Sequence, residues 1–344
     1  MSLLEVDNLQ VAYRTKRGVL QAVDGVSFSV EAGETLGLVG ESGCGKSSLG
    51  KAIMRLVEPT SGSIRMDDVD ITHLSARSLR PHRKRFQMVF QDPSGSLDPR
   101  QRIGDLIEEP MVFHRTGSRS ERKQRVRDLM AQVGLHPDVI NRLPHEFSGG
   151  QRQRIAIARA LALEPKLIVC DEPVSALDVS LQAQILNLLS DLQRDRGIAY
   201  LFVSHDLSVV QHLADRIAVM YLGQIVEIAP RTELWRSPAH PYTRALIDAV
   251  PVMDPRLSRI ADKALLKGDL PNPYSPPTGC RFSSRCPQVV ELCRTTSPSL
   301  TEVAPGHVAA CHFALPHVVA ATAHPITFVR KPGTDMAAPT KRSA

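Results

Sequence analysis

The sequence predicts an α/β fold in which a mainly parallel sheet carries helices on both faces. Short apolar runs at residues 36–39, 167–170 and 200–203 alternate with helical stretches, and each run ends in polar or glycine-rich sequence. Past about residue 235 prolines become frequent, and four of the six cysteines lie there. These observations predict one α/β domain at 1–235 and a small C-terminal Cys-rich domain at 236–320, followed by a disordered tail at 321–344.

The first thirty residues predict antiparallel strands, because residues 3–30 alternate apolar and polar positions and are rich in Val, Leu and Phe. Tyr13 lies there in a turn-like stretch, just before the basic residues Arg14 and Lys16. Its ring could stack on a purine, or it could be no more than an aromatic residue of an edge strand.

A glycine-rich stretch follows the apolar run 36–39 and leads into a helical stretch at 49–56. It reads Gly40, Glu41, Ser42, Gly43, Cys44, Gly45, Lys46, Ser47 and Ser48. In this context G-x-x-x-x-G-K-[ST] binds phosphate, because backbone N–H groups and a helix N-terminus converge on one anion. Lys46 would reach the terminal phosphates, and the Ser47 hydroxyl would bind Mg²⁺. The stretch therefore predicts a nucleotide site.

Polar residues end three further apolar runs, and ligands in such folds lie at the carboxyl ends of strands. Asp171 and Glu172 follow one run, Gln91 a second and His205 a third. Glu172 could be the general base, with His205 on the γ-phosphate and Gln91 beside the attacking water. Ser47, Gln91 and Asp171 could hold Mg²⁺. Each of these residue types also occurs at strand ends in a purely structural role.

Residues from about 95 to 165 are charged and helical and predict a helical insertion, which Pro110 and Pro144 interrupt. A helix begins in it at Ser148, Gly149, Gly150 and Gln151, with Ser148 as the N-cap. This helix start is a second potential phosphate site. One chain needs two such sites only if a second copy of the domain supplies the opposite one.

The chain has 344 residues and a net charge of +6, with basic and acidic residues interspersed. This pattern favours a solvated face, or a face beside anionic lipid, over nucleic-acid binding. No apolar run approaches the roughly 20 residues that span a bilayer, and no secretory signal is visible. We therefore expect a cytosolic chain whose cysteines are reduced.

Six motifs in order resemble an ATP-binding cassette (ABC) ATPase, a P-loop NTPase, over residues 3 to about 235. They are the stretch 40–48, Gln91, the stretch 147–151, the stretch 167–172, the stretch 175–178 and His205. The one departure is Phe147, where the family usually has Leu. The resemblance implies that two cassettes pair head to tail, with each ATP between one Lys46 loop and the partner's signature at Ser148–Gln151. It also implies that Asp178 belongs to the D-loop and that Tyr13 stacks on adenine.

The C-terminal part resembles that of the ATPases of oligopeptide/dipeptide importers. The resemblance rests on His240-Pro241-Tyr242-Thr243, Pro271-Asn272-Pro273, Pro277-Thr278-Gly279-Cys280-Arg281-Phe282 and Arg285-Cys286-Pro287. The run 34–40 resembles the second of the two ATPase subunits that these importers usually carry. The resemblance implies a peripheral subunit at the cytoplasmic face of the membrane that hydrolyses ATP. Its partners would be a second ABC ATPase subunit in a heterodimer, two transmembrane permease subunits and an extracytoplasmic substrate-binding protein, with no nucleic acid.

Four cysteines, Cys280, Cys286, Cys293 and Cys311, follow the spacing C-x5-C-x6-C-x17-C. Four thiolates suit a [4Fe–4S] cluster or a structural zinc ion, and the missing C-x2-C pair makes zinc less natural. The family resemblance favours the cluster, while packed thiols without a ligand stay a third possibility.

Three alternatives concern function. Related importers handle nickel complexes, glutathione or sugars in place of peptides. A soluble ABC ATPase acting on nucleic acid would typically carry two cassettes or a long coiled coil, and this chain has one cassette and no heptad run. A non-hydrolysing regulatory module would have lost Glu172 or the signature, and both are present.

Overall fold

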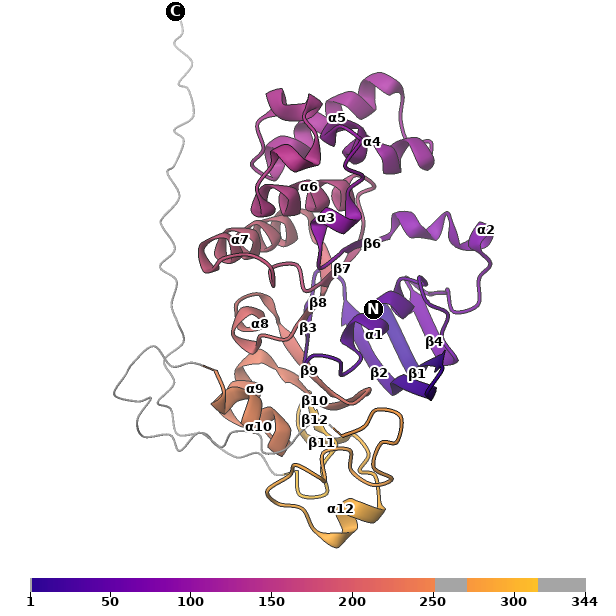
Figure 1. The fold of residues 1–344 in the computed structure, drawn as a ribbon, viewed down its shortest axis with the longest axis vertical. Helices are drawn as coiled ribbons and strands as arrows, with labels where there is room; N and C mark the ends of the chain where they lie inside the picture. Colours follow the sequence, from indigo (N-terminus) through magenta and orange to yellow (C-terminus); the bar gives the residue numbers. More distant parts are fainter. Residues whose placement is uncertain (1, 251–270, 315–344) are drawn as a thin grey trace, which may run out of the picture.

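The computed structural model describes residues 2–250 and 271–314 of the chain (Figure 1). An eight-stranded sheet has the order β11-β12-β10-β9-β3-β8-β7-β6. Its five parallel strands are β3 (Thr35–Val39), β6 (Phe86–Val89), β7 (Leu167–Asp171), β8 (Ala199–Ser204) and β9 (Arg216–Tyr221). The antiparallel end consists of β10 (Gln224–Pro230), β11 (Thr301–Ala304) and β12 (His307–Ala309). The predicted mainly parallel sheet is confirmed.

The two faces of this sheet are covered differently. One face packs on α6 (Gly149–Leu161), α7 (Val179–Arg196) and α8 (Leu207–Leu213). The other face packs on α1 (Lys46–Ile53) and on a four-stranded antiparallel sheet. The strands of that second sheet, in order, are β2 (Gly18–Glu31), β1 (Ser2–Thr15), β4 (Ser61–Met66) and β5 (Val69–Asp70). Helices therefore cover both faces as predicted, and on one face a small antiparallel sheet packs beside the helix.

Tyr13 lies in β1 and pairs with Leu20 of β2, so the predicted turn-like stretch is wrong. Strand β1 is an inner strand, because β2 and β4 flank it on either side. The pairing with β4 ends at Gln10, however, so at Tyr13 the strand pairs with β2 alone, as the edge-strand alternative expects. The basic residues after Tyr13 suggested a turn at that point. The turn between β1 and β2 lies later in the chain, between the paired residues Thr15 and Gly18.

Between β6 and β7 the chain is helical, in the region where the insertion is predicted. The segment contains α3 (Pro93–Ser96), α4 (Ile103–Phe113), α5 (Arg119–Gln132), two 3₁₀ turns at Pro137–Asn141 and Pro144–Glu146, and α6. Helix α4 continues through Pro110, which the sequence led us to expect as an interruption. An internal proline costs about 3 kcal/mol, and the buried face of α4 with Ile107 and Met111 offsets that cost.

The remaining short helices are α2 (Ala76–Leu79), a 3₁₀ turn at His82–Lys84, α9 (Arg231–Arg236), α10 (Pro241–Asp248) and α12 (Glu291–Thr295). Within the described residues, none of the helices has the length and apolar character needed to cross a bilayer.

The C-terminal segment continues the large sheet, because β12 pairs with β10. Buried Glu227 on β10 accepts hydrogen bonds from the backbone N–H groups of Ala239 and His240 and contacts Nε2 of His307. Residues 251–270 and 315–320 of the predicted Cys-rich domain lie outside the described residues, as does the predicted tail at 321–344. The domain boundary at residue 236 stays a prediction.

Candidate active site

A cavity of about 520 Å³ opens at the carboxyl ends of the parallel strands. Most of the predicted nucleotide site meets there, since the lining includes Tyr13, Ser42 to Ser48, Gln91, Glu172 and His205. Strand ends and the phosphate loop therefore converge as the sequence predicted.

The glycine-rich loop joins β3 to α1, and two of its glycines are required by close contacts. Gly40 has φ +156°, and a Cβ atom there would lie 2.2 Å from the carbonyl oxygen of Met220. Gly45 has φ +108°, and its Cβ atom would lie 2.1 Å from the carbonyl oxygen of Ala22. Helix α1 then begins with no side-chain cap, so its first N–H groups face the cavity and can bind an anion.

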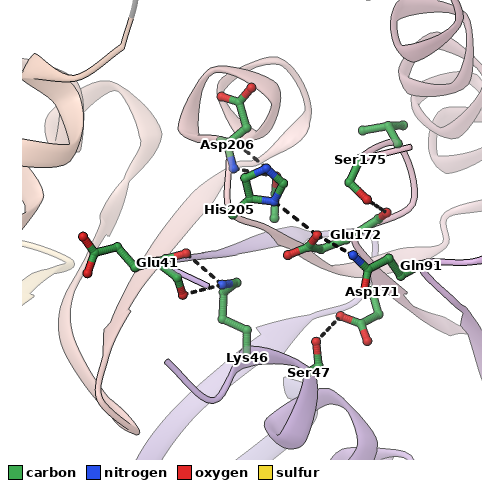
Figure 2. A network of polar contacts seen from close by, with 12 residues as sticks. Glu41, Lys46, Ser47, Gln91, Asp171, Glu172, Ser175, His205 and Asp206 are labelled. Atoms are coloured by element: carbon green, nitrogen blue, oxygen red, sulfur yellow. Dashed lines mark hydrogen bonds and ion pairs between the residues drawn. The ribbon is translucent and has the colours of Figure 1, made fainter. Parts of the chain in front are cut away.

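The Lys46 ammonium is buried and is held along the loop. Its Nζ donates to the carbonyl oxygens of Gly40 at 2.7 Å and Glu41 at 2.9 Å (Figure 2). Figure 2 shows the Glu41 carboxylate directed away from Lys46. Gly40 and Glu41 are not among the lining residues, so of the nine predicted loop residues these two do not face the cavity.

Asp171 and Ser47 meet beside the loop. The Ser47 hydroxyl donates to Oδ1 of Asp171 at 2.8 Å, and the residue Asp171 is 4% exposed. Burial raises the pKa of Asp171, while Ser47 and the nearby lysines act in the opposite direction. A buried carboxyl beside a hydroxyl is an oxygen donor set that suits Mg²⁺, because the cation would replace the lost solvation of the carboxylate.

Glu172 joins the other two predicted catalytic residues. Its Oε2 accepts from Nε2 of Gln91 at 2.9 Å and lies 3.1 Å from Nδ1 of His205 (Figure 2). Glu172 has φ +46°, an uncommon value for a residue with a Cβ atom, and its N–H donates to the carbonyl of Val203. Such local strain is often found at functional sites, where the surrounding structure enforces it.

The cavity also has lining residues that the sequence analysis missed. They are Leu20, Gln21, Ala22, Leu222, Gly223, Pro273, Pro276 and Arg281. The predicted residue Tyr13 lines the cavity together with these residues, and its hydroxyl donates to Oγ of Ser48 at 3.3 Å. Ala22 could have been suggested by its place on the strand that pairs with Tyr13. Pro273 and Arg281 belong to the C-terminal motifs quoted above, but nothing in those motifs places them, or Pro276, at a loop more than 200 residues away.

The signature residues Ser148 to Gln151 lie at the start of α6 and outside the cavity lining. Ser148 is the N-cap as predicted, since its Oγ accepts from Gln151 N–H while Gln151 accepts from Ser148 N–H. Asp178 is the N-cap of α7 and accepts from the N–H of Leu181 at 2.9 Å. Neither helix start serves this chain's own cavity.

The four C-terminal cysteines line one small apolar pocket together with Phe282 and Phe313. Burial raises the pKa of Cys280 to about 11. Within residues 2–250 and 271–314, no three His, Cys, Asp or Glu side chains lie close enough together to hold a metal ion. The predicted metal or iron–sulfur site is therefore not confirmed. The other two cysteines lie apart from this pocket, Cys44 in the phosphate loop and Cys170 in β7.

Comparison with known families gives two matches. Residues 23–175 match the model of the ABC transporter family, and residues 226–293 match the oligopeptide/dipeptide transporter C-terminal region. Among solved structures, the dimeric cassette MJ0796 in a post-hydrolysis state with ADP and Pi has a TM-score of 0.62 and 30% identity. The match covers 66% of this chain and 98% of that one. CbiO1 from Clostridium perfringens has a TM-score of 0.61 and 28% identity, over 68% of this chain and 90% of that one.

Among full-length relatives, the oligopeptide transport ATP-binding protein AppF of Bacillus subtilis is 53% identical over 301 residues. The alignment covers 87% of this chain and 92% of AppF. The alignment includes both the cassette and the region of the C-terminal match, so both matched regions occur together in AppF as they do in this chain. The chain therefore belongs to the ABC transporter family, among the ATP-binding proteins of the oligopeptide/dipeptide transporters.

Proposed function

We propose that this chain binds ATP with Mg²⁺ and hydrolyses it to drive peptide uptake through separate permease subunits. The observation that carries the proposal is the meeting of three contacts beside the phosphate loop. Ser47 contacts Asp171 on one side, and Glu172 contacts Gln91 and His205 on the other. A metal-binding pair beside a base with two partners is what in-line attack of water on a γ-phosphate needs.

Each side chain has a role that its position supports. The loop N–H groups and Lys46 bind the phosphates, and the Tyr13 ring stacks on the adenine. Glu172 accepts the proton of the attacking water, while Gln91 orients that water and His205 donates to the γ-phosphate. Ser47, Asp171 and the Gln91 amide oxygen would hold Mg²⁺. The metal ion supplies charge neutralisation at the phosphate oxygens.

The signature residues support a dimer, because Ser148 to Gln151 form a helix N-terminus that lies outside this chain's own cavity. We infer that they close the ATP site of a second cassette, with Asp178 at the interface, and that this second cassette is a different ATPase subunit. Two permease subunits and an extracytoplasmic binding protein complete the importer. This chain would sit peripherally at the cytoplasmic face of the membrane.

Uptake by right-side-out vesicles that are loaded with ATP and carry the chain with its permeases tests the whole proposal. We expect ATP-dependent uptake of labelled di- and oligopeptides, and none when the binding protein is omitted. Uptake of nickel complexes, glutathione or sugars with no peptide uptake would reassign the substrate. ATPase activity that responds to nucleic acid and not to permeases would contradict the importer assignment.

The cysteine pocket supports a second proposal, that Cys280, Cys286, Cys293 and Cys311 bind a [4Fe–4S] cluster in a C-terminal domain spanning 236–320. All four line one apolar pocket. In a [4Fe–4S] cluster each cysteine binds a different iron atom. The four sulfur atoms therefore stand further apart than four sulfur atoms around one zinc ion, each of which lies about 2.3 Å from the metal.

Protein purified without oxygen is expected to be brown, with broad absorbance at the edge of the visible range, because thiolate-to-iron charge transfer absorbs there. Replacing Cys286 by Ser should remove this absorbance, and the matched variant Cys170→Ser should keep it. Iron and zinc analysis gives the decisive count. Colourless protein with one zinc per chain supports the zinc alternative, and protein with neither metal supports unligated thiols.

A further inference from the structure

Arg285 and Glu41 join two parts of the chain that are 244 residues apart. Nη1 of Arg285 donates to Oε2 of Glu41 at 2.7 Å, and Nη2 donates to Oε1 at 3.0 Å. The Arg285 side chain is 5% exposed and that of Glu41 is 23% exposed. The pair is bidentate, with its cationic half almost fully enclosed.

The segment that carries Arg285 is fixed to the cassette by its neighbours. The Phe282 ring packs against Tyr221 of β9 and Tyr242 of α10, with ring centres 5.3 and 5.4 Å away. Arg281 donates to the carbonyl oxygen of Leu222 and forms an ion pair with Asp24. Residues 280–286 therefore rest on the turn that follows β9, beside the cavity.

Glu41 is held at three points, although its carboxylate does not face the cavity. The carboxylate binds Arg285, and the N–H donates to the Tyr242 hydroxyl at 2.9 Å. The carbonyl accepts from Lys46 at 2.9 Å, as Figure 2 shows. A phosphate loop binds tightly only when its N–H groups already point inward, since any ordering on binding costs affinity. Each contact of Glu41 restricts the loop to one shape.

We propose that Arg285 is a positioning residue of the nucleotide site, which holds the phosphate loop in its binding shape through Glu41. ATP affinity then depends on the C-terminal segment 280–286, and this segment is a place where affinity can be regulated. The inference rests on the proposed function only in that the cavity binds ATP. Because coupling between two sites is reciprocal, bound nucleotide must also stabilise segment 280–286.

An ordinary surface ion pair would not have this effect, since exposed pairs contribute little. Here both carboxylate oxygens are engaged, and removing either partner leaves the other charge largely enclosed. Only a guanidinium can donate two parallel hydrogen bonds to one carboxylate in this way, because a lysine ammonium is a point charge on a flexible chain.

The test measures binding of a fluorescent ATP analogue and steady-state hydrolysis by the purified full chain. Arg285→Met should weaken nucleotide binding about tenfold and raise KM by the same factor. The turnover number at saturating ATP should stay within twofold, because Glu172, Gln91 and His205 are untouched. Arg285→Lys should restore only part of the loss. Glu41→Gln should reproduce the loss, and the double variant should be no weaker than either single variant.

A second readout is hydrogen exchange of segment 280–286. ATP should slow its exchange in the wild type and not in Arg285→Met. The matched control is Arg294→Met, an exposed arginine of α12 outside this segment, which should behave as the wild type.

Unchanged affinity in Arg285→Met, or additive losses in the double variant, would overturn the inference. If Arg285→Met unfolds the C-terminal segment, Glu41→Gln decides, because it leaves that segment intact and breaks the same pair. Failure of the proposed function looks different, since the wild-type chain itself would then bind no nucleotide.

Discussion

Glu172→Gln is expected to abolish steady-state ATP hydrolysis while ATP still binds. Gln has the same shape and keeps an oxygen for the Gln91 hydrogen bond, so only the base is lost. A positioned general base contributes about 10²- to 10⁴-fold to the rate, and turnover should fall within that range. Measurement of phosphate release and of nucleotide affinity on the same protein separates the two effects.

The same variant should also accumulate an ATP-bound dimer with its partner cassette, because the ATP that joins the two proposed surfaces is no longer hydrolysed. Light scattering with and without ATP checks this, and adding Ser148→Arg should prevent the dimer by blocking the start of α6. Glu58→Gln is the control, since Glu58 is exposed and outside the cavity lining. Hydrolysis at more than a tenth of the wild-type rate in Glu172→Gln would move the base to another residue.

Lys46→Met is expected to weaken ATP binding by about a hundredfold, which corresponds to about 2.7 kcal/mol. Met has a similar length but no charge, so the charge-assisted hydrogen bonds to the terminal phosphates are lost. The carbonyl oxygens of Gly40 and Glu41 also lose their donor, which loosens the loop itself.

Titration with a fluorescent ATP analogue measures this loss, and ADP should be affected less than ATP if Lys46 reaches the terminal phosphate. Lys123→Met on α5 is the control, because Lys123 is exposed and far from the loop in the fold. Affinity within threefold of the wild type would show that the helix N-terminus alone holds the nucleotide.

Most of the candidate nucleotide site could be predicted from the sequence. Gln91, Asp171, Glu172 and His205 each follow an apolar run, and neighbouring parallel strands end at the same edge of a sheet. That these side chains lie close together follows from the direction of the strands alone. The N-cap role of Ser148 is equally local, because a capping box is a contact between residues three apart.

Elements that depend on packing were predicted less well. Tyr13 lies in a strand and not in a turn, because pairing of β1 with β2 overrides its local charged neighbours. Pro110 stays inside α4, because the buried face of that helix outweighs the local cost. Local preference is weak compared with burial, so only the assembled core decides such cases.

The sequence by itself determined the fold class, the phosphate loop and the order of the catalytic motifs, because these depend on short-range patterns. Only the tertiary structure decided how Glu41 is used. Its carboxylate turns away from the cavity to meet Arg285, and Pro273, Pro276 and Arg281 approach the same cavity from the C-terminal segment. Contacts across more than 200 residues have no spacing rule, since they exist only where the sheet and the aromatic packing of Phe282 bring both segments together.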